Sequence, residues 1–354
     1  MTIPWGRTLF ILPTYSSHMG VNLTPIIKKK VVDLTYLSGK MLAFDANNVL
    51  YQFLALIRTR GGIPLTDKNG NITSHLTGLA FRATRLLCDY NIKLIYVFDG
   101  KPPQLKIKEI QKRREIKKKA RKEWEEALKR QDYATAYSKS TMTSSLTQDM
   151  IQDAQQLLTC LGIPYVQAPS EAEAQAAYMT KDIYAAASRD YDTLLFGAKK
   201  QVRYVTIQGR EYLPSKGYSR MYHPEIIDLQ EFLHHLHITR EQLVDLSILM
   251  GNDFTTGIKG IGPKKGLNLI REYKTLENLP SKIYEKLPEN FDQIRHIFLA
   301  PEVTDNYSLQ YTPYKEDSLI HFLKDKTFSE KSIERIVERM RTFHSKGTLE
   351  RWLQ

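Results

Sequence analysis

Three apolar segments of this chain each run into aspartate, and this pattern limits the possible folds more than any other feature. The segments are KMLAFDA with Asp45, KLIYVFDG with Asp99, and DIYAAASRDYD with Asp190 and Asp192. Continuous apolar runs of this kind indicate strands buried on both faces, and helical patterns over residues 73–90 and 147–161 separate them. The sequence therefore predicts an α/β fold with a mostly parallel central sheet flanked by helices.

These aspartates are expected to meet at one edge of the sheet, because open α/β sheets gather ligands beyond the carboxyl ends of their strands. Two more acids, Glu171 and Glu173, lie where Pro169 and the expected N-cap Ser170 begin a helix. Residues two apart on a helix point about 200° away from each other, so both can reach one target only from its first turn. Six clustered carboxylates require a cation. An all-oxygen set favours Mg²⁺ or Mn²⁺ over zinc or copper.

The charge of the chain indicates an acidic partner. Its 354 residues include 51 Lys and Arg against 39 Asp and Glu, a formal net charge of +12. No apolar run approaches the roughly 18 residues of a membrane span, so we expect nucleic acid as the partner and no membrane. The two cysteines, Cys88 and Cys160, lie in apolar helical patterns and are predicted to be reduced core residues of an intracellular protein.

Residues 106–139, between Asp99 and Glu171, are dense in Lys and Arg. Such a run alone would suit a solvated helix face. Its position between two groups of predicted ligands favours an insertion that arches over the site. Lys106 and Arg113 are seven residues apart, so one helix would place both on the same face.

The stretch GNDFTTGIKGIGPKKGLNLI, residues 251–270, places glycines around a proline and lysines. It favours two helices joined by a tight hairpin, with the amino end of the second helix offering free N–H groups to a phosphate. This pattern is close to a helix-hairpin-helix, which holds the DNA backbone without reading bases. Asp253, at its start, adds a seventh carboxylate.

With these motifs the chain resembles the flap endonucleases of the structure-specific 5′ nuclease family, and most of all the compact archaeal type with its PIN-like fold. The matching stretches cover most of residues 19–275 and are FDANNVLYQFL, TSHLTGLAFR, YVFDGKPPQLK, APSEAEAQAAY, SRDYDTLLFG and GNDFTTGIKGIGPKKG. The resemblance implies a metal-dependent 5′ flap endonuclease and 5′–3′ exonuclease. Its substrate would be branched DNA with a 5′ flap, in Okazaki fragment maturation and long-patch base excision repair.

The resemblance also implies roles for individual residues. Two Mg²⁺ or Mn²⁺ ions would be held by Asp45, Asp99, Glu171, Glu173, Asp190, Asp192 and Asp253. Lys106 and Arg113 would face the scissile phosphate, and Tyr51 would stack near the attacked nucleotide. The DNA-binding set would comprise Tyr51, Arg58, Arg82, Glu171, Gly251, Asp253, Gly260, Gly262, Lys264 and Lys265. In this family the hairpin also holds a K⁺ ion through backbone carbonyls.

The two ends of the chain depart from the family pattern. The usual Met-Gly start corresponds to Met19 and Gly20, so residues 1–18 are either an extension or precede the true start. The tail KGTLERWLQ resembles one that binds a PCNA-type sliding clamp, with Leu349, Trp352 and Leu353 as apolar anchors. Lys346 and Leu353 replace the usual glutamine and second aromatic, so we expect reduced affinity for the clamp.

The predicted organisation has six parts, and we expect a monomer that is cytoplasmic in an archaeal cell or nuclear in a eukaryotic one. The parts are an extension (1–18), an N-terminal nuclease region (19–118), the rest of the helical arch (119–145), an internal nuclease region (146–275) with its helix-hairpin-helix (247–275), a C-terminal region (276–345) and the clamp-binding tail (346–354).

Two alternatives to a flap endonuclease stay open. A related 5′ exonuclease or a junction or bubble nuclease is disfavoured by the short insertion before Glu171. A noncatalytic DNA-binding scaffold is disfavoured by the complete set of carboxylates.

Overall fold

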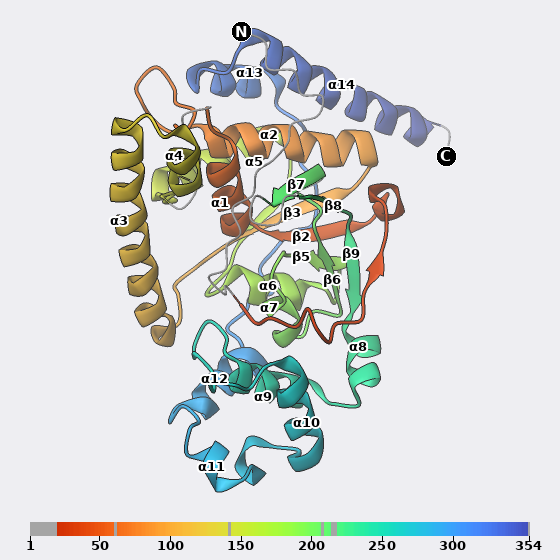
Figure 1. Cartoon of the computed structure of the whole chain (residues 1–354). Coiled ribbons are helices and arrows are strands. Elements are labelled where there is room, and N and C mark those ends of the chain that lie inside the picture. Colours follow the sequence, from red (N-terminus) through yellow and green to blue (C-terminus); the bar gives the residue numbers. More distant parts are fainter. Residues whose placement is uncertain (1–19, 60–61, 141–142, 207–208, 214–217, 353–354) are drawn as a thin grey trace.

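The chain folds into three layers, a central sheet between two groups of helices, in this computed structural model (Figure 1). The structure describes residues 20–59, 62–140, 143–206, 209–213 and 218–352. Seven strands form the sheet in the order β1-β9-β6-β5-β2-β3-β4. The pairs from β6 to β4 are parallel, whereas β9 runs antiparallel to both β1 and β6. The prediction of a mostly parallel sheet is confirmed.

The strands are short, and two of the three predicted strand ends are correct. The strands are β1 Lys30–Val31, β2 Met41–Asp45, β3 Lys93–Phe98, β4 Tyr165–Gln167, β5 Ala185–Ala187, β6 Lys200–Arg203 and β9 Glu225–Asp228, with a separate hairpin of β7 Gly209–Leu213 and β8 Tyr218–Tyr222. Asp45 ends β2, and Asp99 directly follows β3. The third prediction was wrong in detail, because the pairing of β5 with β2 stops at Ala187. Asp190 therefore lies in the following turn, and Asp192 begins a helix.

Helices cover both faces of the sheet (Figure 1). On one face lie α1 Ala46–Leu56, α2 Ser74–Thr84, α5 Gln148–Leu161, α13 Glu316–Asp325 and α14 Glu330–Trp352. On the other lie α6 Ala172–Met179, α7 Asp192–Leu195 and α8 Leu229–Leu236, and beyond them a further group that shares the same core, namely α9 Arg240–Met250, α10 Pro263–Tyr273, α11 Ser281–Tyr284 and α12 Phe291–Leu299. Helices α3 Ile107–Lys129 and α4 Tyr133–Ser140 pack on each other at one side and form the arch. Shorter turns are η1 Leu34–Leu37, the π-helical η2 Arg85–Asp89 after α2, η3 Gln104–Lys106 and η4 Leu276–Asn278.

The helix ends follow ordinary capping chemistry. The hydroxyl of Thr147 accepts the Met150 N–H at 3.3 Å and starts α5, which ends at Gly162 in the left-handed conformation. A reciprocal capping box between Thr239 and Gln242 starts α9. These caps satisfy backbone groups that the helix itself leaves unpaired.

The pleat of the central strands supplies two cores, one on each face. In β2, Leu42 and Phe44 point into the core beneath α1, α2 and α5, whereas Ala43 enters the core beneath α6 and α9. Cys160 is buried and Cys88 is partly buried, and neither takes part in a disulfide, in agreement with the prediction of reduced cysteines. In the described part of the chain, no helix has the length and apolarity needed to cross a bilayer.

Candidate active site

The first turn of α1 orients three of the predicted metal ligands. Asp45 caps this helix, because its Oδ1 accepts the N–H of Asn48 at 2.9 Å. The side-chain amide of Asn47 donates to Asp99 at 2.8 Å, and that of Asn48 donates to Asp190 at 3.3 Å. The sequence analysis missed both asparagines. A polar pair directly after a buried strand was the available signal.

Glu171 is itself the N-cap residue of α6, so the prediction that Ser170 caps this helix was wrong. The hydroxyl of Ser170 donates instead to the carbonyl of Lys101 at 3.2 Å. The first free N–H of the helix, on Ala172, donates to Asp99 Oδ1 at 2.8 Å. The carboxylate of the residue after β3 thus satisfies the helix start and holds Glu171 near the sheet edge.

A close backbone approach fixes this arrangement. The N–H of Gly100 donates to the Ser170 carbonyl at 2.6 Å. A Cβ at position 100 would lie 2.2 Å from the carbonyl oxygen of Ala168. Only glycine lets the end of β3 and the start of α6 meet at this distance.

Three more carboxylates accept hydrogen bonds from nearby donors. These are Ser188 Oγ to Glu173 at 2.8 Å, Val21 N–H to Asp192 at 2.9 Å and Gly20 N–H to Asp253 at 3.0 Å. The segment that begins at Gly20 therefore lies against the site. We call the seven acids together the carboxylate edge; they are Asp45, Asp99, Glu171, Glu173, Asp190, Asp192 and Asp253.

Lys106 reaches into the carboxylate edge from the base of the arch. Its ammonium pairs with Glu171 and lies 3.2 Å from Asp253 Oδ2. Lys106 ends η3 and is the N-cap residue of α3, which follows it directly and carries Arg113, so their common helix face stays a prediction. Arg113 lies within α3, and its side chain is outside the described part of the structure.

The acids of the edge affect one another's protonation. Burial raises the pKa of five of them, namely Asp45, Glu171, Glu173, Asp190 and Asp192. For Asp192, burial and then the charge of Asp253 raise the pKa to about 8. Burial alone would lower the pKa of Lys106, but Glu171 and Asp253 raise it above its usual range. In the absence of a bound cation, burial and mutual repulsion therefore disfavour the charged forms of these acids.

The donor set fits a divalent cation, since carboxylate oxygens are the ligands that Mg²⁺ prefers. Among the described residues, no group of three or more His, Cys, Asp or Glu side chains is arranged to hold a metal as it stands. Backbone amides, asparagines, Ser188 and Lys106 engage the carboxylate oxygens in this structure. Metal binding would exchange several of these contacts for the ion.

The predicted DNA-binding residues occupy different surroundings. Tyr51 is 38% exposed on α1, and Nζ of Lys117 in the arch lies 4.6 Å from its ring centroid. Arg58 donates to the carbonyls of Leu54 and Gly62 at 2.9 and 2.8 Å. Tyr51 thus faces the arch, whereas Arg58 is engaged at the end of α1.

Arg82 is half-buried on α2. Its Nη1 has no hydrogen-bond partner among the described residues, and burial lowers its pKa to about 10. The DNA contacts of Arg58 and Arg82 remain predictions.

The hairpin between α9 and α10 has the predicted helix-hairpin-helix shape. Gly251 has φ +100°, and a Cβ on Gly257 would lie 2.3 Å from the Gly251 nitrogen. The two sides of the hairpin are therefore in direct backbone contact. Gly262 is the N-cap residue of α10, and Lys264 and Lys265 are exposed in its first turn. Gly260, with φ +87°, lies in open space on the hairpin. This end of α10 presents N–H groups and lysines to solvent.

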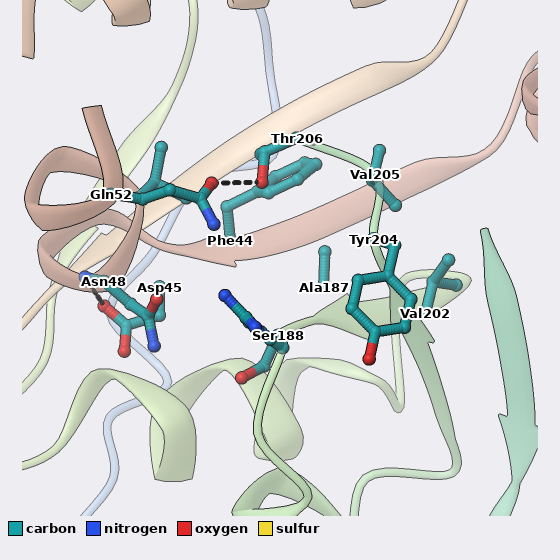
Figure 2. A pocket seen from close by; sticks show the side chains of 12 residues that line it. Phe44, Asp45, Asn48, Gln52, Ala187, Ser188, Val202, Tyr204, Val205 and Thr206 are labelled. Carbon is teal, nitrogen blue, oxygen red and sulfur yellow. Dashed lines mark hydrogen bonds between the residues drawn. The ribbon is translucent and has the colours of Figure 1, made fainter. Parts of the chain in front are cut away.

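A small pocket opens beside Asp45, between α1, β2 and the segment after β6 (Figure 2). Asn48, Gln52 and Tyr204 line it, and Gln52 accepts a hydrogen bond from the Thr206 hydroxyl at 2.8 Å. The polar groups of the pocket extend the site from Asp45 toward β6.

The predicted parts at the two ends of the chain are not described. Residues 1–18 and Leu353 lie outside the described residues, and so do the side chains of Leu349 and Trp352 within α14.

Comparison with known proteins decides the family. Two sequence families match, the XPG N-terminal domain over residues 19–120 and the XPG I-region over residues 162–253. Flap endonuclease 1 of Thermococcus onnurineus (strain NA1) is 45% identical over 342 residues, which cover 94% of this chain and 99% of that protein. The chain belongs to the flap endonuclease family.

Solved structures agree with this assignment. Flap endonuclease-1 from Methanococcus jannaschii matches with a TM-score of 0.72 and 38% identity, over 92% of this chain and all of that one. The catalytic core of Rad2 in complex with a DNA substrate matches with a TM-score of 0.62 and 25% identity, over 88% of this chain and 95% of that one. The predicted family, fold and flap endonuclease activity are confirmed, and members of this family are metal-dependent nucleases.

Proposed function

We propose that the carboxylate edge binds two Mg²⁺ ions and that the protein uses them to cut 5′ flaps where they join duplex DNA. The observation that carries this proposal is the gathering of seven acids, from separate strands, turns and helices, around Lys106. Bound Mg²⁺ would supply the positive charge that activates a water molecule and stabilises the leaving 3′ oxygen. The products would be a 5′-phosphate and a 3′-hydroxyl.

In this proposal Lys106 exchanges its partners during the reaction. Its ammonium pairs with Glu171 and Asp253 in the free protein. With metal held by Glu171 and Asp253, the Lys106 ammonium would be available to the scissile phosphate, where negative charge develops. Arg113, seven residues further along the arch, would contribute a second positive charge.

Tyr51, exposed on α1 beneath the arch, would stack on a base near the attacked nucleotide. The helix-hairpin-helix would hold the duplex by its backbone through Lys264, Lys265 and the glycines at 251, 260 and 262, with K⁺ bound at hairpin carbonyls. Arg58 and Arg82 would add phosphate contacts. Because these contacts read no bases, specificity would come from the shape of the junction.

We further propose that the tail residues Leu349, Trp352 and Leu353 bind a PCNA-type sliding clamp, with the enzyme itself a monomer. The enzyme would then act inside the cell at Okazaki fragments and in long-patch base excision repair. Its location would be that of the DNA, the cytoplasm of an archaeal cell or the nucleus of a eukaryotic one.

Cleavage of matched flap, nick, bubble and four-way junction substrates, with and without Mg²⁺, tests the proposal. We expect cutting of the flap at its junction, only in the presence of metal. Preferred cutting of the bubble or the four-way junction would contradict flap specificity. Binding without cutting of any substrate would favour the noncatalytic scaffold.

A further inference from the structure

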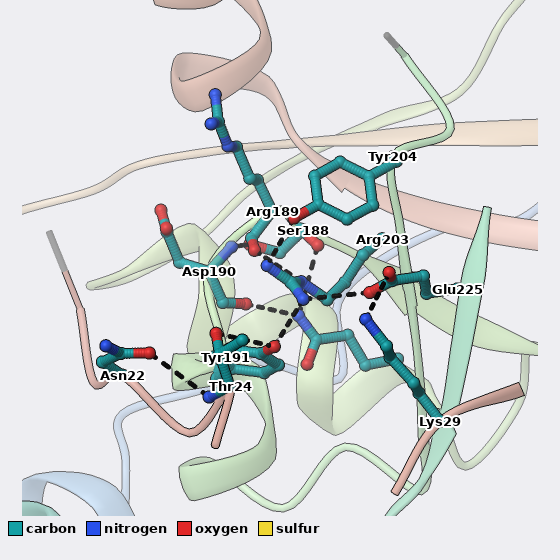
Figure 3. Close-up of polar contacts among 11 residues, drawn as sticks. Asn22, Thr24, Lys29, Ser188, Arg189, Asp190, Tyr191, Arg203, Tyr204 and Glu225 are labelled. Atoms are coloured by element: carbon teal, nitrogen blue, oxygen red, sulfur yellow. Dashed lines mark hydrogen bonds and ion pairs between the residues drawn. The ribbon is translucent and has the colours of Figure 1, made fainter. Parts of the chain in front are cut away.

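The turn that carries Asp190 and Asp192 is held by a buried arginine of β6, Arg203 (Figure 3). Nε of Arg203 donates to the carbonyl of Arg189 at 2.8 Å, and its Nη1 donates to the hydroxyl of Tyr191 at 2.5 Å. The guanidinium carbon also lies 4.0 Å from the ring centroid of Tyr191. Arg203 thus contacts the residue on each side of Asp190.

A second side chain of β6 holds the same turn. The amide of Gln201 donates to the carbonyl of Ser188 at 3.2 Å and also to the carbonyl of Asp190. Gln201 is fully buried. Donors from two alternate positions of one strand therefore fix three consecutive carbonyls of the turn, those of residues 188, 189 and 190.

Arg203 is in turn anchored from the opposite side. Its Nη1 lies 3.1 Å from Oε2 of Glu225, which faces it across the β6–β9 pair, and Nη2 donates to the hydroxyl of Tyr204 at 2.9 Å. Lys29 pairs with the same Glu225 at 2.5 Å (Figure 3). Arg203 and Glu225 are only 7% and 6% exposed, so the guanidinium has its position and charge balance set before any metal binds.

An ion pair that merely joined β6 to β9 would need one contact, to Glu225. Arg203 also contacts Arg189 and Tyr191, which belong to the turn and are not needed to join the two strands. A lysine could keep the charge pair, but its single ammonium could not reproduce the planar fork that serves four partners.

We propose that Arg203, together with Gln201, is a positioning residue that fixes the turn so that Asp190 and Asp192 present their carboxylates to one divalent cation. This inference rests on the proposed function, which makes these two aspartates metal ligands. Arg203 touches neither substrate nor metal and acts through the turn. Groups that orient metal ligands in this way affect metal affinity about 10- to 100-fold.

The test measures metal binding apart from activity, by titrating the protein with Mn²⁺ and following free Mn²⁺ by electron paramagnetic resonance. We expect Arg203→Met to raise the Kd for Mn²⁺ at least about tenfold. Arg203→Lys should retain most of the thermal stability without restoring the affinity for Mn²⁺. Gln201→Leu gives a second variant of the same clamp, with a smaller loss of affinity expected, in case the Met variant does not fold.

The matched control is Lys200→Met, because Lys200 pairs with Asp228 at 3.0 Å across the same two strands. It should lower the melting temperature and leave the Kd for Mn²⁺ unchanged. Parental affinity in both Arg203→Lys and Gln201→Leu would overturn the inference. Asp192→Ala separates the two hypotheses: if it also binds Mn²⁺ like the parent, the proposed metal site itself is wrong.

Discussion

The carboxylate edge and the hairpin between α9 and α10 are both polar, but they are built in opposite ways. At the edge, Asp45, Glu171 and Asp192 are at most 9% exposed, and protein donors hold the acids. In the hairpin, glycines touch through backbone, and Lys264 and Lys265 remain in solvent. Catalysis at a phosphate is favoured by charged groups that are already desolvated and held in place. Binding of the DNA backbone requires exposed positive charges. Cutting and binding should therefore be separable by mutation.

The largest effect should come from Asp192→Ala, which removes a proposed metal ligand at the start of α7. We expect the rate of flap cleavage in Mg²⁺ to fall by more than about 10³-fold. Flap binding in Ca²⁺, measured by fluorescence anisotropy, should stay near that of the parent. An equal loss of binding would mean that this carboxylate serves the fold, and the separation of the two regions would fail.

Lys106→Ala should lower single-turnover cleavage by about 10² to 10³, because its charge acts on the transition state. Flap affinity should change by less than about tenfold, since many other cations share the salt-dependent attraction. Lys122→Ala, an exposed lysine of α3, is the control. Equal rates for the two variants would show that Lys106 is an ordinary surface charge.

Changing both Lys264 and Lys265 of the hairpin to alanine should affect DNA binding and not the cleavage step. We expect flap affinity to fall about tenfold and the slope of log K against log salt to decrease by about 2, with the saturated cleavage rate unchanged. The double variant Lys282→Ala with Lys286→Ala removes the same charge from the α11 region. If the control weakens binding as much, the hairpin has no special part in holding DNA.

The smallest effect on the isolated enzyme should follow from replacing Leu349 and Trp352 with alanine. Cleavage by the free enzyme should be unchanged, because these residues lie outside both regions. Stimulation by a sliding clamp should disappear, since buried apolar anchors dominate such interfaces. Equal stimulation of variant and parent would contradict the proposal that the tail binds a sliding clamp.

The sequence predicted the parts of the site that depend on local pattern. An apolar run before Asp45 or Asp99 indicates a buried strand, and the end of a parallel strand indicates the edge. The location of Glu171 at a helix start was also correct. The predicted N-cap of α6 was wrong, because the N–H of Ala172 donates to Asp99 and not to the neighbouring Ser170.

The contacts that sequence reasoning missed join distant segments. Val21 donates to Asp192, and Arg203 of β6 holds the turn before α7 through the carbonyl of Arg189. Neither contact can be predicted from residue periodicity or spacing in the sequence, because each forms only when the strands take their order in the sheet. The antiparallel β9, which supplies Glu225, likewise follows from the tertiary pairing with β6.

The hydrogen bond from Gly20 to Asp253 has a consequence for the order of events in folding. Its partners are 233 residues apart, so a chain emerging from the ribosome carries the complete basic arch well before it can close the carboxylate edge. Contacts of such long separation cost the most loop entropy and are expected to form late. We expect the Gly20 and Val21 amides to gain protection after the strands do in pulse-labelling hydrogen exchange. The newly made enzyme would then be unable to cut nucleic acid until its synthesis has passed Asp253.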